Sequence, residues 1–320
     1  GPEVLQIEEL EVGAPGSGEL RIRVEAIGLN RAEAMFRSGV YLEPTHLPAR
    51  LGYEASGIVE ALGSGVHGFE VGEAVSVIPA FSMNKFGVYA EQAIVPATGV
   101  LKRPAGVGAV KGAAIWMQYL TAYGALIEIA QLKRGDAVII TAASSSVGLA
   151  AIQIANSVGA IPIATTRTRA KEAALREAGA AHVIATEEQD LVAEVMRITD
   201  GRGARIAFDP VAGPQVETLA QAMSQQGLLF IYGNLSGQET PFPALVAMNK
   251  ALSVRGYTLF ELTGDPQRLA PAQAFITRGL EAGQLKPIIA KTFPFEQIVE
   301  AHRYMESNQQ FGKIVVTVSR

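Results

Sequence analysis

The chain has 320 residues, of which 48% are hydrophobic and 18% charged, and 33 are glycine, a composition typical of a folded α/β protein with two domains of ordinary size. The formal net charge of -4 gives no electrostatic support for binding nucleic acid or an anionic membrane surface. Because the chain has no cysteine and only four widely spaced histidines, disulfides and thiolate metal sites are excluded and other transition-metal sites are disfavoured.

The first hundred residues predict a β-rich lobe. Residues 20–27 alternate between apolar and polar side chains, which is typical of a strand with one buried face. Further strands are expected at 55–62, 74–78 and 87–95, separated by glycine-rich turns such as GSGVHG and EVGE. Helical spacing is scarce in this part, so a first domain is expected over 1–106.

From residue 107 the pattern changes to helices and strands in alternation. Residues 137–142 are apolar and β-branched without alternation, as expected of a parallel strand buried on both faces. Helical spacing follows over 147–158, and a second strand over 161–165 completes half of a nucleotide-binding fold. A doubly wound, Rossmann-type parallel sheet is therefore predicted over 107–258. The remaining elements of this domain are helices at 171–177, 191–198 and 214–223 and strands at 183–185, 205–208 and 228–232.

The last part of the chain predicts a mixture of elements. Residues 252–259 have an extended pattern, 266–281 and 295–306 have helical spacing, and 313–318 form a final apolar strand. We expect the segment 259–320 to return to the first lobe.

Five segments, in order, resemble one protein family. They are GPEVLQI at 1–7, AIGLNRAEAMFRSGVY at 26–41, LGYEASGIVEALGSGV at 51–66, GD at 135–136 followed by AASSSVGLAAIQIA at 142–155, and FGKIVVTV at 311–318. In these segments the chain resembles the medium-chain dehydrogenase/reductase superfamily, and within it the zinc-free quinone oxidoreductase (zeta-crystallin-like) branch. The resemblance implies a GroES-like catalytic lobe beside the Rossmann domain, and a further strand before residue 1.

The turn after the strand at 137–142 carries a weakened glycine fingerprint. Ala143, Ser145 and Gly148 occupy its three positions, where small residues let backbone amides and a helix N-terminus reach a pyrophosphate. A purely structural turn and a flavodoxin-like phosphate site are the alternatives, and a serine nucleophile is disfavoured because no G-x-S-x-G elbow is present. The resemblance implies cofactor contacts at Ser145, Ser146, Val147 and Gly148.

The end of the second strand indicates the choice of cofactor. NAD-binding folds place an acid there, whereas here Thr166 is followed by Arg167, Arg169 and Lys171. Three cations at the positive end of a helix are unfavourable without an anion, although a solvated helix terminus is the simpler alternative. We predict that Thr166, Arg167 and Lys171 contact the 2′-phosphate of NADPH.

The catalytic zinc positions of the superfamily align with Asn30, Tyr53 and Met117, which do not form a zinc ligand set. The cysteine-rich loop of a structural zinc site is also absent between Ala93 and Lys102. Without a Lewis acid, acceptors that take a hydride easily are favoured, which are quinones and activated alkenes.

Catalysis is then expected to depend on hydrogen-bond donors to an oxygen that gains negative charge. Asn30, Tyr41 and Tyr53 are the candidates, although loop tyrosines often only pack. The resemblance also implies cofactor contacts at Thr121, Gly312 and Lys313. Gly233 and Asn234 are expected to contact the cofactor because they follow a late strand at its carboxyl end, where ligands of open sheets bind.

The predicted function is therefore NADPH-dependent, zinc-independent hydride transfer to a small quinone or α,β-unsaturated carbonyl. The alternatives are a nucleotide-binding relative with little turnover and an enoyl-thioester reductase. No nucleic acid or membrane partner is expected, and a homodimer is expected through the edge strand LSVRGYTL at 252–259. No apolar run approaches the roughly 20 residues that span a bilayer, and the first residues lack the pattern of a signal peptide. A cytoplasmic location is expected.

Overall fold

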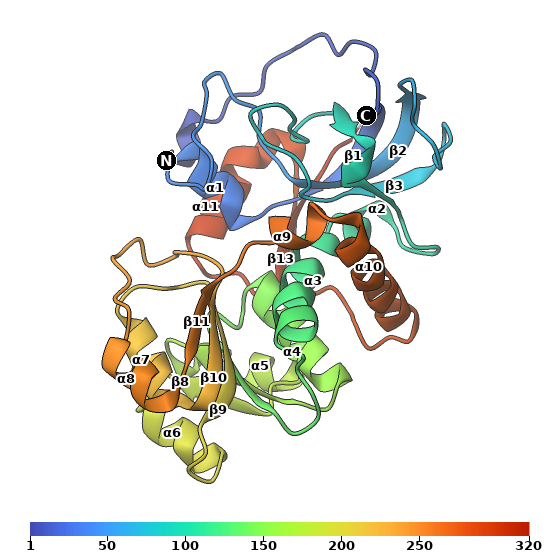
Figure 1. Ribbon diagram of the computed structural model, residues 1–320. Coiled ribbons are helices and arrows are strands. Elements are labelled where there is room, and N and C mark those ends of the chain that lie inside the picture. Colours follow the sequence, from blue (N-terminus) through green and yellow to red (C-terminus); the bar gives the residue numbers. More distant parts are fainter. Residues whose placement is uncertain (320) are drawn as a thin grey trace. The chain divides into compact units, whose positions relative to one another are not determined.

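The computed structural model describes residues 1–319, which form two compact units (Figure 1). The first unit contains residues 1–117 and the chain from 287 onward, and the second is Gln118–Lys286. The sequence placed the domain boundaries at 106 and 258. In the structure, residues 107–117 belong to the first unit and residues 259–286 to the second.

The first unit is built on a seven-stranded sheet with the order β12-β13-β1-β2-β3-β5, and β4 pairs with β1. The alternation seen in the sequence is the burial pattern of β1, whose apolar side chains face the core. The last strand, β13, pairs antiparallel with β1 and parallel with β12. The elements are η1 (Pro2–Val4), β1 (Glu19–Gly28), α1 (Arg31–Arg37), β2 (Glu54–Leu62), β3 (Ala74–Val77), β4 (Gln92–Pro96), η2 (Ala97–Gly99), β5 (Val100–Lys102), α2 (Ala109–Gly112), β12 (Ile289–Pro294), η5 (Phe295–Gln297), α11 (Ile298–Glu306) and β13 (Lys313–Thr317).

A buried histidine joins α11 to α1. Nη1 of Arg37 lies 2.9 Å from Nδ1 of His302, and the Tyr89 hydroxyl lies 3.1 Å from Nε2. A guanidinium only donates, so Nδ1 accepts and Nε2 carries the proton. Burial, with Arg37 nearby, lowers the pKa of His302 to about 4. The ring is therefore a neutral structural link, which Arg37 extends through an ion pair with Glu306 at 2.8 Å.

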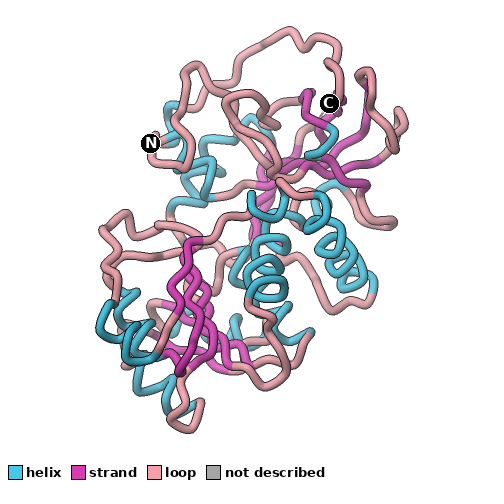
Figure 2. The backbone as a smooth tube through the Cα atoms, viewed as in Figure 1, coloured by secondary structure: helices cyan, strands magenta, loops and turns pink. Residues whose placement is uncertain are grey.

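The second unit is built on a six-stranded parallel sheet with the order β11-β10-β9-β6-β7-β8. Figure 2 shows its strands in magenta. Two βαβ halves start from the adjacent strands β6 and β9, which is the strand order of dinucleotide-binding folds. The elements are α3 (Trp116–Tyr123), η3 (a π-helix, Gly124–Ile129), β6 (Ala137–Ile140), α4 (Ser146–Ser157), β7 (Ile161–Thr166), η4 (Arg169–Lys171), α5 (Glu172–Glu177), β8 (His182–Ala185), α6 (Leu191–Ile198), β9 (Ala204–Asp209), α7 (Gln215–Ala222), β10 (Met223–Ile231), α8 (Ala244–Lys250), β11 (Ser253–Gly256), α9 (Phe260–Thr263) and α10 (Pro266–Glu281).

Ligands of such sheets bind outside the carboxyl ends of the strands, at the point where the strand order reverses. In this unit that point lies between β6 and β9, which pair in parallel through Ile139 and Ala207. All four residues of β6 are buried, as its unbroken apolar sequence predicts. The turns after β6, β7 and β9 are therefore the segments to examine for a site.

Candidate functional site

The turn from β6 into α4 presents a helix N-terminus with unpaired amides. Ser145 is the N-cap residue, and its Oγ accepts a hydrogen bond from the backbone amide of Gly148 at 3.1 Å. The amides of Ser146 and Val147 have no hydrogen-bond partner among residues 1–319. Unpaired amides at the positive end of a helix favour an anion. The serine cap therefore leaves two backbone donors for a phosphate.

Gly148 lies where α4 crosses closest to the turn. A Cβ at this position would lie 2.6 Å from Cα and 2.7 Å from the carbonyl oxygen of Ala143. Any side chain would push the helix away from the turn, and with it the amides of Ser146 and Val147. Gly148 therefore acts by close packing, as the third glycine of the fingerprint does.

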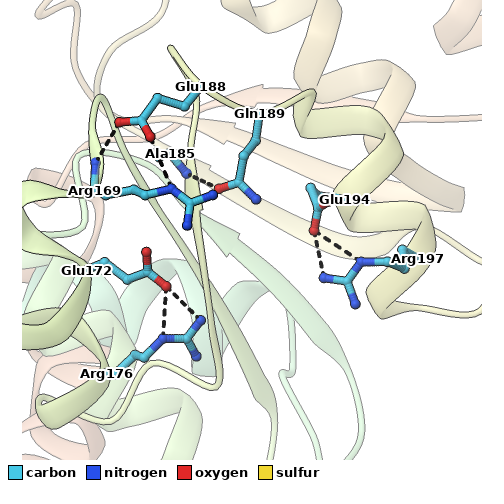
Figure 3. A network of polar contacts seen from close by, with 8 residues as sticks. All are labelled: Arg169, Glu172, Arg176, Ala185, Glu188, Gln189, Glu194 and Arg197. Carbon is cyan, nitrogen blue, oxygen red and sulfur yellow. Dashed lines mark hydrogen bonds and ion pairs between the residues drawn. The ribbon is translucent and has the colours of Figure 1, made fainter.

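The cations after β7 have different partners. Nε of Arg169 donates to Glu188 at 3.0 Å, and the backbone amide of Arg169 donates to the same carboxylate at 3.1 Å (Figure 3). Nζ of Lys171 donates to Oγ of Ser144 at 3.1 Å. The side chain of Arg167 is exposed and makes no ion pair within residues 1–319. A carboxylate thus neutralises Arg169, while Arg167 keeps its charge exposed.

Arg167 and Lys171 lie close enough to affect each other's charge. Burial lowers the pKa of Lys171, and the positive charge of Arg167 lowers it further. Thr166, at the end of β7, brings no negative charge between them, and its carbonyl accepts from the amide of Thr186 at 2.9 Å. Two neighbouring cations repel each other, and an anion such as a phosphate can relieve this repulsion through charge-assisted hydrogen bonds.

The other charges around β8 form exposed ion pairs. Figure 3 shows Glu172 with Arg176 at 3.0 Å and Glu194 with Arg197 at 2.6 Å. Exposed pairs of this kind contribute little to stability. Arg167, which makes no ion pair within residues 1–319, is therefore the exposed cation of this region to consider for binding, together with the neighbouring Lys171.

The turn after β9 is fixed by a buried carboxylate. Asp209 accepts hydrogen bonds from Thr141 in the β6 turn and from the amides of Val211 and Ala212, the latter two at 3.1 and 2.8 Å. Burial raises the pKa of Asp209. Asp209 therefore holds the turns after β6 and β9 together at the edge where ligands bind. Of the residues predicted from sequence, Gly233 and Asn234 follow β10 at this edge, with Asn234 exposed, and Thr121 is buried in α3.

In the first unit, Lys313 is the centre of a buried polar cluster. Its ammonium donates to Oδ1 of Asn30 and to Oε2 of Glu54, both at 2.5 Å, and its side chain is 0% exposed. The other carboxylate oxygen of Glu54 accepts from the amide of Met117 at 3.0 Å. The cluster therefore ties β13 to the start of α1, to β2 and to the backbone at Met117, all within the first unit.

The amide of Asn30 is fully engaged in this cluster. Its Nδ2 donates to the carbonyl of Gly28 at 3.0 Å and to Glu33 at 3.4 Å, while its oxygen accepts from Lys313. Glu33 also accepts from the backbone amides of Asn30 and Tyr53, at 2.7 and 3.2 Å. Burial raises the pKa of Glu33 to about 7, against the opposing effect of Lys313.

Asn30 and Lys313 therefore lie in the interior with their polar atoms bound to each other and to carboxylates. In this arrangement neither offers a group to a bound ligand, whereas the sequence suggested Asn30 as a donor to substrate and Lys313 as a cofactor contact. Gly312 serves the backbone, because its φ is +102° and a Cβ would lie 2.4 Å from the carbonyl oxygen of Ile288.

Two tyrosines of the first unit form a hydrogen-bonded pair. The ring centroids of Tyr41 and Tyr53 are 6.1 Å apart and their hydroxyls share a hydrogen bond. The Tyr53 hydroxyl also donates to Glu43 at 3.1 Å. Burial raises the pKa of both hydroxyls, which are therefore protonated at neutral pH. Since Tyr53 also bonds Glu43, Tyr41 is the candidate donor of the pair.

Glu43 was not identified from the sequence. It accepts hydrogen bonds from Ser82 Oγ, from the amide of Met83 at 3.0 Å and from the side chain of Asn84 at 3.3 Å. It therefore fixes one loop against another about 40 residues along the chain. The sequence has no local indication of this role, because a single acid in a loop is usually solvated.

No three His, Asp or Glu side chains within residues 1–319 are grouped so that they could hold a metal ion. Over the same residues, no helix is long and apolar enough to cross a membrane.

Comparison with known proteins agrees with this geometry. The alcohol dehydrogenase GroES-like domain matches residues 16–105, and the family described as zinc-binding dehydrogenase matches residues 146–277. A quinone oxidoreductase of Pseudomonas aeruginosa is 30% identical over 99% of this chain and 96% of its own length, and a 2-haloacrylate reductase of a Burkholderia species is 29% identical with the same coverage. The crystal structure of Escherichia coli quinone oxidoreductase complexed with NADPH has a TM-score of 0.92 and 30% identity, and covers 99% of this chain and 97% of its own.

The chain belongs to the medium-chain dehydrogenase/reductase superfamily, and within it to the zinc-free quinone oxidoreductase branch. The predicted fold class, a Rossmann-type parallel sheet with a β-rich GroES-like lobe, is confirmed.

Proposed function

We propose that this protein is an NADPH-dependent oxidoreductase that reduces quinones or α,β-unsaturated carbonyls without zinc. The observation that carries the proposal is the pair of neighbouring cations, Arg167 and Lys171, on the second βα turn of a dinucleotide-binding sheet. Relatives named quinone oxidoreductase and 2-haloacrylate reductase, and a structural neighbour complexed with NADPH, support it.

The residues of the second unit fit this cofactor. The amides of Ser146 and Val147 and the hydroxyl of Ser145 would hold the pyrophosphate, with Gly148 keeping α4 close to the turn. Arg167 and Lys171 would hold the 2′-phosphate, with Thr166 leaving room for it. We assign Thr121, Gly233 and Asn234 to the nicotinamide half. When bound, the cofactor supplies a hydride from C4 of the nicotinamide.

On the substrate side we assign Tyr41 as the hydrogen-bond donor. A quinone or enone oxygen gains negative charge as the ring or alkene accepts a hydride, and a hydroxyl donor stabilises that charge. Tyr41 has a proton that can rotate toward this oxygen, while Tyr53 donates its own to Glu43. Asn30, whose side chain accepts a hydrogen bond from Lys313, then contributes by stabilising the buried polar cluster and not by contacting the substrate.

The proposal is tested by mixing the protein with NADPH and a panel of quinones, enones and an enoyl thioester while the absorbance of the reduced cofactor is followed. We expect consumption with quinones or enones, little with NADH, and no effect of EDTA. Binding of NADPH without consumption across the panel would favour a nucleotide-binding protein with little turnover. Preference for the thioester would favour an enoyl reductase.

A homodimer is also proposed, with β11 as the interface strand. β11 is the last strand of its sheet and pairs only with β10 among residues 1–319. The preceding helix α8 and its approach expose Phe242 (66%), Leu245 (79%) and Met248 (70%). An open strand edge beside exposed apolar side chains favours association. Light scattering should give twice the chain mass, and Leu245→Glu with Met248→Glu should give a monomer. A monomer mass for the wild type at micromolar concentration would contradict this.

We retain the cytoplasm as the proposed location, which cell fractionation would test.

A further inference from the structure

We propose that Glu43 is a positioning residue, which holds the side chain of Tyr41 in place through the hydroxyl of Tyr53. The inference rests on the proposed function, because that function gives Tyr41 its role as the donor to the substrate oxygen. It adds to the site an acid that does not itself contact the substrate. All three residues lie within the first unit.

The carboxylate of Glu43 is anchored to a neighbouring loop. Its Oε1 atom accepts from the backbone amide of Met83 at 3.0 Å and from the Tyr53 hydroxyl at 3.1 Å. Its Oε2 atom accepts from the hydroxyl of Ser82 and from the side-chain amide of Asn84, the latter at 3.3 Å. Because each oxygen has two donors, the carboxylate cannot rotate without losing hydrogen bonds. Glu43 is therefore a fixed acceptor for the Tyr53 hydroxyl.

Tyr41 depends on such an anchor because its own segment provides little packing. It lies between α1 and β2, outside any helix or strand, and the adjacent Leu42 is 72% exposed. A tyrosine side chain in a loop of this kind has several rotamers open to it. Each rotamer that directs the hydroxyl away from the substrate lowers the population that is competent for reaction. Fixing the phenol in one position removes this loss.

Tyr53 connects the fixed carboxylate to Tyr41. The ring of Tyr53 is buried, with its centroid 5.8 Å from that of Phe81, and its backbone amide donates to Glu33 at 3.2 Å. The ring centroids of the two tyrosines are 6.1 Å apart, and their hydroxyls share a hydrogen bond. A phenol forms a charge-assisted bond with a carboxylate, and neighbouring hydrogen bonds in a chain strengthen one another. Glu43 therefore stabilises the positions of both hydroxyls.

The test measures kcat and KM with NADPH and a quinone or enone that the wild type reduces, together with the dissociation constant of NADPH. The variants are Tyr41→Phe, Tyr53→Phe, Glu43→Ala, Glu43→Gln and the double variant Tyr41→Phe with Glu43→Ala. Thr45→Val is the matched control for loosening of the loop. Thr45 lies two residues beyond Glu43, and its hydroxyl donates to the carbonyl of Phe36.

We expect Glu43→Ala and Tyr53→Phe each to lower kcat by about 3- to 10-fold, the range for the loss of one hydrogen bond. The KM of the acceptor and the dissociation constant of NADPH should change less than about twofold, because the bond from Tyr41 strengthens as charge develops in the transition state. Glu43→Gln should stay within about twofold of the wild type in kcat, since its amide oxygen still accepts from Tyr53. Thr45→Val should stay within the same range.

The double variant separates positioning of Tyr41 from a general effect on the fold. Once Tyr41→Phe has removed the donor, Glu43→Ala should lower kcat no further. Should Glu43→Ala fail to fold, Tyr53→Phe breaks the same link and leaves the carboxylate with its three other donors.

Any of four results would overturn the inference while leaving hydride transfer intact. They are a wild-type kcat in Tyr41→Phe or Tyr53→Phe, an undiminished effect of Glu43→Ala in the Tyr41→Phe background, a loss in Glu43→Gln equal to that in Glu43→Ala, and an equal loss in Thr45→Val. The last would mean that any anchor of the loop has the same effect. A wild type that consumes no NADPH with any acceptor would instead overturn the proposed function, and this inference with it.

Discussion

Two lysines that the sequence assigned to the same cofactor have opposite surroundings. Lys313 is completely buried and its ammonium is bound by Glu54 and Asn30. Lys171 is partly buried, is held by the neutral hydroxyl of Ser144, and faces another cation, Arg167. The charge of Lys313 is balanced by a carboxylate inside the fold, whereas Lys171 is one of the two cations that we propose bind a phosphate. The burial of a lysine and the partners of its ammonium therefore decide whether it is a ligand candidate.

From this comparison we expect Lys313→Met to lower the free energy of unfolding more than any other variant considered below. Removing the ammonium leaves Glu54 and the polar side of Asn30 buried without their partner, and breaking such a pair costs about 3–5 kcal/mol of unfolding free energy. Urea denaturation measures this. Lys171→Met is the matched control and should stay within about 0.5 kcal/mol.

If the buried pair is the cause, adding Glu54→Gln to Lys313→Met should recover part of the loss. Equal stability of Lys313→Met and Lys171→Met would mean that burial does not distinguish these two lysines.

A change of similar size in the free energy of unfolding is expected when the pH is raised, because Glu33, in the same cluster, titrates. Its pKa in the folded protein is about 7, against an ordinary value of 4.5. The folded state therefore binds this proton more tightly than the unfolded state. The resulting stability is complete below pH 4.5 and is lost as the pH rises through about 7, a change of about 3 kcal/mol. In Glu33→Gln this part of the pH dependence should disappear.

The measurement is urea denaturation of wild type and Glu33→Gln between about pH 5 and 8. The two curves should converge at low pH and separate at high pH, with the variant more stable there. Parallel curves would show that Glu33 does not titrate in this range.

A smaller effect, on binding rather than stability, is expected for Arg167→Ala. It removes a charge-assisted hydrogen bond to the 2′-phosphate worth roughly 1.5–3 kcal/mol, or about a 10- to 150-fold loss of NADPH affinity. NADH binding should barely change, and Thr166→Asp should shift preference in the same direction. Dissociation constants for both nucleotides decide this.

Arg169→Ala is the control for Arg167→Ala, because Glu188 already neutralises Arg169. Arg169→Ala should weaken NADPH binding much less than Arg167→Ala does. If Arg167→Ala weakens both nucleotides equally, the 2′-phosphate is not bound by this residue.

The smallest loss of stability is expected for Arg176→Ala. Arg176 and Glu172 form an exposed pair one helical turn apart at 3.0 Å (Figure 3), and such pairs contribute about 0.3–0.5 kcal/mol. Calorimetric melting should detect at most this change, and it should vanish at high salt. A loss as large as that of Lys313→Met would remove the contrast between buried and exposed pairs.

The sequence by itself determined the fold class and most of the elements, and it also suggested the cofactor residues that we propose. Two local patterns each predict one kind of strand. The unbroken apolar run of β6 predicts a strand buried on both faces, and the alternation of β1 predicts a strand with one buried face. The turns that we propose bind phosphate could be suggested for the same reason, since Ser145, Gly148 and Lys171 lie within one βα unit and the start of the next. The strand expected at 87–95 is shorter in the structure, where it is β4, Gln92–Pro96, and the sequence did not predict α1, α8 or β12. The residues just before β4 bond instead to the loop that contains Leu51, because the amide of Tyr89 donates to the carbonyl of Leu51.

Only the tertiary structure decided which polar residues are internal. Lys313 meets Glu54 across 259 positions and Asn30 across 283. No local pattern indicates such a contact, because it arises only when β13 pairs with β1. Glu43 and Tyr53 likewise meet through the folding of two loops. Whether a charge binds a ligand or supports the fold depends on its burial and its partners, and both are properties of packing between distant segments.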